Sequence, residues 1–475
     1  KSMECRYGFE LADAMAPRIP TNTRVSNVFE VDGTLVYCSE GGLYYNGGSG
    51  FEEITGPTGN KSFPTANSQT MIDSALWGDH TILTSDNGAV PVKIFKHNDE
   101  IKMINAGLPK LLADPNIAPS QDDSKNYIYA FVYEYEYQIG TTTYLDLGEV
   151  AYMPIRGGAD LSEVGRFNAI ADIPMLTNGT TRNYDETAIR VQIYRTTHNG
   201  SVYHHVETLE NGVDNYADET SDDELVTGAV IYTQGGIQNN ELPPQAKYIT
   251  INNNVAYYAN IVESAESKPY RLKFSKIADP DSVPATFYED FDSEIMGIAS
   301  IDDRVVVLTA HKCYAIEGVL DDVGRGSVFR KSIANVGCVS NGSIVVTQDF
   351  IYWLSDSGAY KTNGVQHKKL TLHLEKTMQL YTDSTVKNRR IKGSYDSTNQ
   401  KIYWCVNTRS ADNDTLLVYD EIHGGFTTQD SGVDFTPSCT ITEGQDLIRC
   451  DVDGYVFRHN KDYYKSRIDF GATTG

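Results

Sequence analysis

The stretch FIYWLSDSGAYKTNG, residues 350–364, has the pattern of one complete β-hairpin. Its first part, Phe350–Trp353, is aromatic and β-branched, as expected of a pleated and half-buried strand. The run stops at Ser355–Gly358, where Asp and Gly tolerate the positive φ angles of tight hairpin turns. A second short strand is expected from Ala359 onward. The stretch therefore predicts strand, turn and strand in 15 residues.

The same turn pattern occurs three more times, as SEGGLY (39–44), SDNGAV (85–90) and DVDGYV (451–456). The last turn glycines of the four copies are Gly42, Gly88, Gly358 and Gly454. Gly42 and Gly88 lie 46 residues apart, and Gly358 and Gly454 lie 96 apart, or twice 48. A period in the forties built of strand–turn–strand units is typical of a β-propeller. We expect the four glycines to form structural hairpin turns.

The composition of the 475-residue chain is that of a large folded β-protein, with 40% hydrophobic and 11% aromatic residues. This length exceeds one ordinary core and predicts two or three domains. Because no segment approaches ~18 uninterrupted apolar residues, no membrane span is expected. The seven cysteines are scattered without CxxC spacing, which favours buried, reduced thiols and synthesis in the cytoplasm over a disulfide framework or a zinc site.

The order of patterns along the chain divides it into four parts. Residues 1–24 carry Pro17 and Pro20 without a clean period and are expected to form an arm that leads into or latches onto the first sheet. Residues 25–120 contain two propeller repeats, and residues 234–475 contain about five more. The repeats number seven, and one of them is either complete or shared between the termini to close the ring. The chain is therefore predicted to be all-β, with a propeller of six or seven blades.

Residues 121–233, between the two sets of repeats, have a different pattern. YIYAFVYEYEY (127–137) alternates with period two over eleven residues, and IRVQIYRT (189–196) precedes an Asn-Gly turn. Long antiparallel strands with one alternating face predict an inserted β-sandwich, similar to immunoglobulin or fibronectin type III modules. One non-β segment, residues 368–383, has apolar residues three and four apart and predicts a short amphipathic helix.

The net charge of −24 argues against a protein that wraps nucleic acid by neutralising phosphates. Residues 121–233 hold 19 acidic and six basic residues, a net charge of −13, which either keeps the inserted module soluble or marks a functional surface. The one basic cluster comprises Lys387, Arg389, Arg390 and Lys392. It is a candidate contact for DNA phosphates or for the acidic surface of an adjacent subunit.

No pattern in the sequence predicts catalysis. The ten histidines include no HExxH or HxH ligand spacing, and no GxSxG, P-loop or dinucleotide GxGxxG motif occurs. The Ser-Asp-x-Gly turns are similar to the Asp boxes of sialidases, but none is followed by the Thr-Trp pair of those boxes. We therefore expect no catalytic residues, no cofactor and no metal site.

Several loose motifs resemble the tail hub or nozzle proteins of short-tailed bacteriophages, also called tail tubular or packaged-DNA stabilisation proteins. The residues that carry the resemblance are RLKFS (271–275), DPDSVP (279–284), IMGIA (295–299), VVVLT (305–309), Tyr314, Glu317-Gly318, GCVS (337–340), the hairpin 350–364, IYRT (193–196) and YAD (216–218). They cover about half of the chain, and none of them is diagnostic alone.

The resemblance implies a structural virion protein with no catalytic residues to transfer. Such a protein forms a homohexameric ring below the portal and adaptor, lines the DNA channel, retains packaged DNA and helps to attach fibres or spikes. DNA would pass without sequence-specific binding, because an acidic wall repels phosphate. Two other functions stay open: a glycan- or ligand-binding propeller of the adhesion type, and, less favoured, a hydrolase of the sialidase type.

Overall fold

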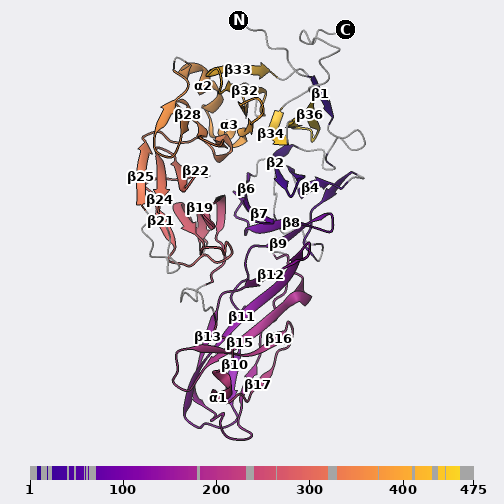
Figure 1. The fold of residues 1–475 in the computed structure, drawn as a ribbon, viewed down its shortest axis with the longest axis vertical. Coiled ribbons are helices and arrows are strands. Elements are labelled where there is room, and N and C mark those ends of the chain that lie inside the picture. Colours follow the sequence, from indigo (N-terminus) through magenta and orange to yellow (C-terminus); the bar gives the residue numbers. More distant parts are fainter. Residues whose placement is uncertain are drawn as a thin grey trace.

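The computed structural model describes residues 8–11, 19, 24–39, 42–47, 50–57, 59, 63, 71–178, 182–231, 240–263, 265–318, 329–372, 374–408, 412–430, 437–443 and 446–460. Seven four-stranded antiparallel sheets within these residues are arranged around a central axis as a β-propeller (Figure 1). Two repeats precede the inserted module and five follow it, as the sequence pattern predicts, and the blade number is seven.

Each blade is a simple meander, and the first strands of neighbouring blades contact one another around the axis. The blades, in order, are β2 (Val25–Val31), β3 (Thr34–Ser39), β4 (Gly42–Asn46) and β5 (Phe51–Glu53); β6 (Ile72–Trp77), β7 (His80–Ser85), β8 (Val92–His97) and β9 (Glu100–Asn105); β18 (Gln245–Asn252), β19 (Val255–Glu263), β20 (Glu266–Phe274) and β21 (Tyr288–Asp290); β22 (Ile295–Ile301), β23 (Arg304–Thr309), β24 (Cys313–Glu317) and β25 (Phe329–Ala334); β26 (Val345–Val346), β27 (Ile351–Ser355), β28 (Gly358–Thr362) and β29 (His367–Lys369); β30 (Lys392–Asp396), β31 (Lys401–Val406), β32 (Thr415–Asp420) and β33 (Gly425–Asp430); and β34 (Pro437–Glu443), β35 (Asp446–Asp451) and β36 (Val456–Asn460) with β1 (Gly8–Leu11).

The seventh blade closes the ring with strands from both ends of the described chain. β1 pairs antiparallel with β36, from Gly8 opposite Asn460 to Leu11 opposite Phe457. Residues 8–11 of the predicted N-terminal arm therefore belong to the last blade, whereas the sequence predicts contact of the arm with the first sheet. Closure of this kind leaves no open edge between the first and last repeats, which would otherwise invite pairing with other chains.

The inserted module consists of two antiparallel sheets, as expected. One sheet has the order β12 (Thr142–Leu147), β11 (Lys125–Ile139), β15 (Ile189–Thr196), β16 (Tyr203–Glu210), with β13 (Ala151–Gly158) also paired to β11. The other contains β10 (Asn116–Pro119), β14 (Asn168–Ala171) and β17 (Tyr216–Asp218). Because β10 belongs to this second sheet, the module begins before the predicted boundary at residue 121.

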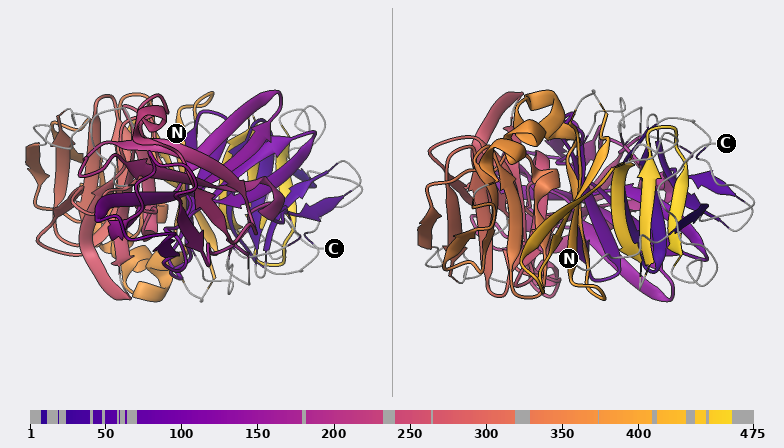
Figure 2. Two further views of the ribbon diagram at one scale, coloured as in Figure 1. Left: turned by 90° about the horizontal axis from the view of Figure 1, so that it is seen from below. Right: turned by 90° about the horizontal axis from the view of Figure 1, so that it is seen from above.

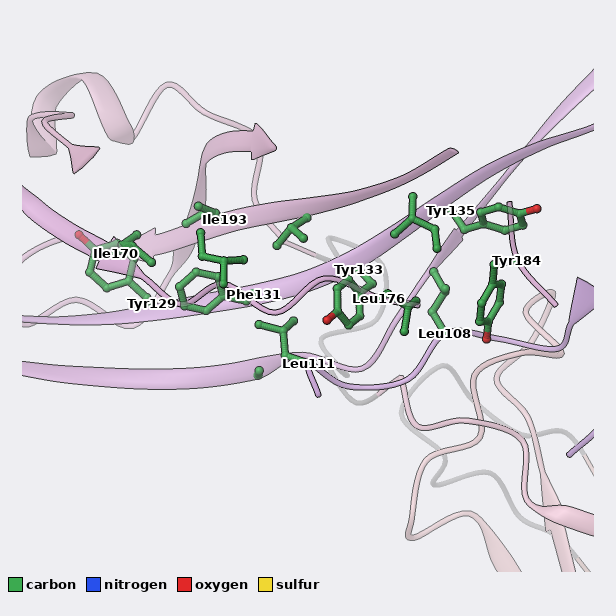
Figure 3. Packing of buried hydrophobic residues seen from close by; sticks show 14 of the residues in the cluster. Leu108, Leu111, Tyr129, Phe131, Tyr133, Tyr135, Ile170, Leu176, Tyr184 and Ile193 are labelled. Atoms are coloured by element: carbon green, nitrogen blue, oxygen red, sulfur yellow. The ribbon is translucent and has the colours of Figure 1, made fainter. Parts of the chain in front are cut away.

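The alternation in β11 determines the core of this sandwich. The odd-numbered residues of β11 from Tyr127 to Tyr137 are all buried, and they pack with residues of both sheets (Figure 3). The same hydrophobic cluster continues into the propeller through Phe95, Ile104 and Leu108 at the second blade. Sandwich and propeller thus share one core at their junction. Viewed along the long axis of the molecule, the propeller is seen edge-on, with strands running from one face of the disc to the other (Figure 2).

The helical segment is shorter than the sequence pattern predicts. Residues 367–369 form β29, which pairs with β28, and two helices follow, α2 (Glu375–Thr382) and α3 (Thr385–Arg390). The sheet takes these residues because β28 offers a free edge to the segment that leaves it. Of the predicted apolar face, Met378 and Tyr381 are buried, whereas Leu374 is exposed.

Candidate functional site

The four predicted turn glycines occupy equivalent places in their blades. Gly42, Gly88, Gly358 and Gly454 lie in or next to the turn between the second and third strand of blades one, two, five and seven. Gly88, Gly358 and Gly454 have φ of 78°, 133° and 87°, a region that favours glycine, whereas Gly42 is the first residue of β4. Since successive strands alternate in direction, these turns all lie at the face where the first strands begin. We call this face the channel mouth.

The predicted basic cluster lies at the channel mouth, on α3 and the start of β30. Arg389 Nη2 is 2.7 Å from Asp86 Oδ2 in the β7–β8 turn, and Arg390 Nη1 is 2.5 Å from Asp412 Oδ1. Lys387 Nζ is 2.9 Å from Asp383 Oδ1 and donates to the carbonyl of Leu380. These three cations are thus engaged within the chain.

The Arg389–Asp86 pair joins two blades on opposite sides of the axis. Arg389 lies in the last turn of α3, shortly before the first strand of the sixth blade, and Asp86 belongs to the second blade, 303 residues away in the sequence. Arg24, just before β2 of the first blade, is 3.5 Å from Asp412 of the sixth blade. The mouth of the propeller channel is therefore bridged by side chains.

The charge of the fourth residue of the cluster acts on a carboxylate of another blade. Lys392 is buried on β30, and its charge acts on Asp73 of β6. Burial raises the pKa of Asp73 to about 6, while the backbone amide of Ile249 and the Lys392 charge oppose this rise. Lys392 and Asp73 thus belong to the first strands of the sixth and second blades, and Lys392 is a structural residue of this chain.

A second ionic cluster lies where the sandwich meets the propeller. Lys93 on β8 is 3% exposed, and its Nζ lies 2.5 Å from Asp146 Oδ2 on β12 and 2.6 Å from Asp281 Oδ2 after β20. Lys93 Nζ also donates to Tyr137 Oη on β11 at 2.9 Å. One ammonium group thereby binds the second blade, the sandwich and the third blade together.

This buried junction contains more carboxylates than cations, and its pKa values are shifted accordingly. Burial raises the pKa of Asp146 to about 7 and that of Asp279 to about 6, and the Lys93 charge opposes both shifts. Burial by itself would lower the pKa of Lys93, but the two carboxylates in contact with it raise that pKa above its usual value. Burial and the Lys93 charge lower the pKa of His80 to about 4. A neutral His80 ring, 2.8 Å from Tyr137 Oη, completes the cluster.

The sandwich has a buried ion pair of its own. Arg195 Nε lies 2.8 Å from Asp218 Oδ2, with both side chains 0% exposed. Tyr129 Oη donates to Asp218 at 2.6 Å, and Asn168 donates to Tyr129 Oη at 3.0 Å. These contacts link β15 of one sheet to β14 and β17 of the other. The buried charges of Arg195 and Asp218 therefore hold the two sheets of the sandwich together.

Among the described residues, no group of three or more His, Cys, Asp or Glu side chains is arranged to hold a metal ion. Within the same ranges, no helix has the length and hydropathy needed to cross a bilayer. Five of the cysteines are buried: Cys38, Cys313, Cys405 and Cys450 in blade strands, and Cys338 in the segment between β25 and β26. Burial raises the pKa of Cys338 to about 11, which keeps its thiol protonated at neutral pH.

Sequence reasoning missed the junction cluster. Lys93, Asp146 and Asp281 stand in three segments that the sequence assigns to different units. One signal was present, since Lys93 is a charged residue within the apolar strand pattern VKIF, but its partners could not be identified without the strand register.

No family model and no curated protein matches this chain. Among solved structures, the computationally designed protein Ika8 matches at 10% identity and a TM-score of 0.39, covering 94% of this chain and 98% of its own. BamB of Moraxella catarrhalis matches at 9% identity and a TM-score of 0.37, with 93% and 94% covered. YCF48 of Cyanidioschyzon merolae matches at 9% identity and a TM-score of 0.32, with 94% and 98% covered.

Proposed function

We propose that this protein is a structural subunit of a bacteriophage tail, a nozzle or hub component below the portal and adaptor. The observation that supports this most is the junction at Lys93, where one buried cation joins the inserted sandwich to two blades. A module fixed in this way keeps one orientation relative to the propeller. A subunit that transmits force within an assembly requires such a fixed orientation. The motifs shared with tail hub proteins support the same function.

The side chains at the channel mouth bear on the path that DNA would take past such a subunit. The Arg389–Asp86 and Arg24–Asp412 pairs bridge different blades at this face, and the charge of Lys392 acts on Asp73. DNA would therefore pass between subunits of a ring and not through the axis of one propeller. The net charge of −24 favours passage without adhesion, because a wall with negative potential repels phosphate. Portal, adaptor and fibre or spike proteins are the partners that this function would require.

The proposal is tested by locating the chain in purified virions. We expect mass spectrometry of intact particles to detect it, and gold-labelled antibodies against the sandwich to decorate the tail end. A protein that stays in the lysate while the particles are free of it would overturn the proposal. If deletion of the gene yields particles that package DNA and then lose it, the protein has the specific role of retaining packaged DNA.

A second function, recognition of a glycan, is favoured by one surface feature of the sandwich. Tyr152 on β13 is exposed, and its ring lies 5.2 Å from the ring of Tyr203 on β16 at an angle of 51°. Paired tyrosines at a surface offer the apolar faces on which sugar rings stack. A glycan array with wild-type and Tyr152→Ala protein separates the two functions, since a tail subunit of purely structural type would bind no glycan in either form.

A further inference from the structure

Lys93 is held against two carboxyl groups in a site that is largely closed to water. Its Nζ lies 2.5 Å from Asp146 Oδ2 and 2.6 Å from Asp281 Oδ2, and its side chain is 3% exposed. The ring of Tyr137 lies beside the ammonium group, with its centroid 4.8 Å from Nζ, and the buried Phe95 packs on that ring. An amine and a carboxyl group in contact, with little water around them, are the two components of an amide bond.

Of the two carboxyl groups, Asp146 is the better acceptor of the amine. Burial raises the pKa of Asp146 to about 7, so that this group takes up a proton readily at neutral pH. A protonated carboxyl group can lose its hydroxyl as water, whereas a carboxylate cannot. Asp281 is suited to a different part, because its Oδ1 is buried and accepts no hydrogen bond from any described residue. That oxygen is therefore available to accept a proton.

We propose that Lys93 Nζ and Asp146 Cγ form an isopeptide bond, which joins the second blade to the sandwich covalently. First, the ammonium group passes one proton to Asp146 Oδ2, and the neutral amine then attacks Asp146 Cγ. Asp281 accepts a second proton from the nitrogen and delivers it to the departing hydroxyl, which leaves as water. One C–N bond forms and one C–O bond breaks. Asp281 is a carboxylate before and after the reaction, and no oxidant or cofactor takes part.

The position of the two groups and their burial both favour this reaction. Well-oriented groups held in contact react as if one of them were present at about 10⁵–10⁸ M. The reaction also replaces a buried ion pair by a neutral amide, which removes the cost of keeping two charges away from water. The N–H that remains on Lys93 can donate to Asp281 Oδ2, which already lies beside it. Chains in which the bond has not formed keep the ion pair and its titration.

An exposed contact of the same kind shows what burial contributes. Lys312 Nζ lies 2.6 Å from Asp292 Oδ2, but these side chains are 39% and 44% exposed. Water solvates both charges there, and no second carboxylate forms an ion pair with Lys312 among the described residues. We expect no bond at this contact, which therefore serves as the control within the same chain.

The bond would change how the inserted sandwich is held. Ionic contacts and packing alone allow the sandwich to separate from the propeller when the junction opens. An amide between β8 and β12 keeps the two parts connected even then, so that a pull on the sandwich is carried to the second blade through covalent bonds. The proposal does not depend on the tail function, because the reaction needs only residues of this chain.

The test is the mass of the denatured full chain, followed by the masses of its tryptic peptides. Formation of the bond lowers the intact mass by that of one water molecule. Because trypsin does not cleave after a modified lysine, the digest should contain a branched peptide that joins residues 62–96 to residues 126–156. Asp281→Asn removes the proton acceptor and should reduce the fraction of branched peptide at least tenfold. The matched control Asp292→Asn should leave that fraction unchanged.

Three results would count against the proposal. A wild-type chain with the full mass of its sequence, and with peptides that end at Lys93, would overturn it. A mass lower by one water without the branched peptide would also overturn it, because an aspartyl succinimide loses the same water. If Asp281→Asn folds, as judged by circular dichroism, and keeps the branched peptide, the role of Asp281 is wrong. Virion location of the chain is measured separately, so failure here and failure of the tail function are distinguishable.

Discussion

Replacing Lys93 by Met should loosen the sandwich from the propeller. Lys93 Nζ lies within 2.6 Å of a carboxylate oxygen of both Asp146 and Asp281, and all three side chains are buried or nearly so. Removing one partner of a buried ionic contact leaves uncompensated charge and costs about 3–5 kcal/mol. Because two carboxylates contact this cation, we expect a loss within this range and the junction to open before the blades unfold.

Hydrogen exchange measured by mass spectrometry shows in which strands the junction opens. A loss of about 4 kcal/mol in the free energy of opening raises the exchange rate of the affected amides by roughly a thousandfold. The increase should be confined to β8, β11 and β12, with the fifth and sixth blades unchanged. Lys102→Met, which removes an exposed lysine on the neighbouring β9, is the control and should change neither exchange nor the unfolding midpoint.

Adding Asp146→Asn and Asp281→Asn to Lys93→Met removes the uncompensated charges and should recover most of the lost protection. If Lys93→Met leaves the exchange of β11 and β12 at the wild-type rate, the junction is not held by this cation and the argument for a rigid subunit loses its support.

Three further predictions concern single sites. Gly358→Val should destabilise the protein by about 1–3 kcal/mol, since φ is 133° there and a Cβ would clash with Thr371 Oγ1; an unchanged thermal midpoint would contradict the turn assignment. Arg195→Met should cost about 3–5 kcal/mol and expose the sandwich to protease, because it leaves Asp218 buried and unpaired; resistance equal to the wild type would refute this. Burial raises the pKa of Asp146 from 3.8 to about 7, so between about pH 4 and 7 the folded protein retains a proton that the unfolded chain releases. The contribution of this group to the free energy of unfolding therefore falls as the pH rises through that window, and Asp146→Asn should remove this part of the pH slope in urea titrations at pH 5 and 7.5.

The blades could be predicted from sequence because their information is local. A turn such as Ser355–Gly358 and the alternating strand before it specify a hairpin within 15 residues, and repetition of that unit gives the architecture. The alternation of Tyr127–Tyr137 likewise predicts which side chains form the sandwich core.

What the sequence could not predict depends on contacts between distant segments. Residues 367–369 have a helical pattern, but the open edge of β28 recruits them as a strand. Arg389 was assigned to an outside partner because nothing near it in sequence shows that Asp86 lies within reach. Lys93, Asp146 and Asp281 meet because the second blade, the sandwich and the third blade converge, which the composition of the chain does not reveal.

The central claim is that propeller and sandwich form one rigid body, and a distance distribution between them tests it most directly. Spin labels at Glu207→Cys on β16 and Lys331→Cys on β25 would place one probe on each part, at positions that are exposed. Pulsed electron paramagnetic resonance should give a single narrow distance in the wild-type background and a broadened one when Lys93→Met is added. A broad or multimodal distribution in the wild-type background would contradict the claim.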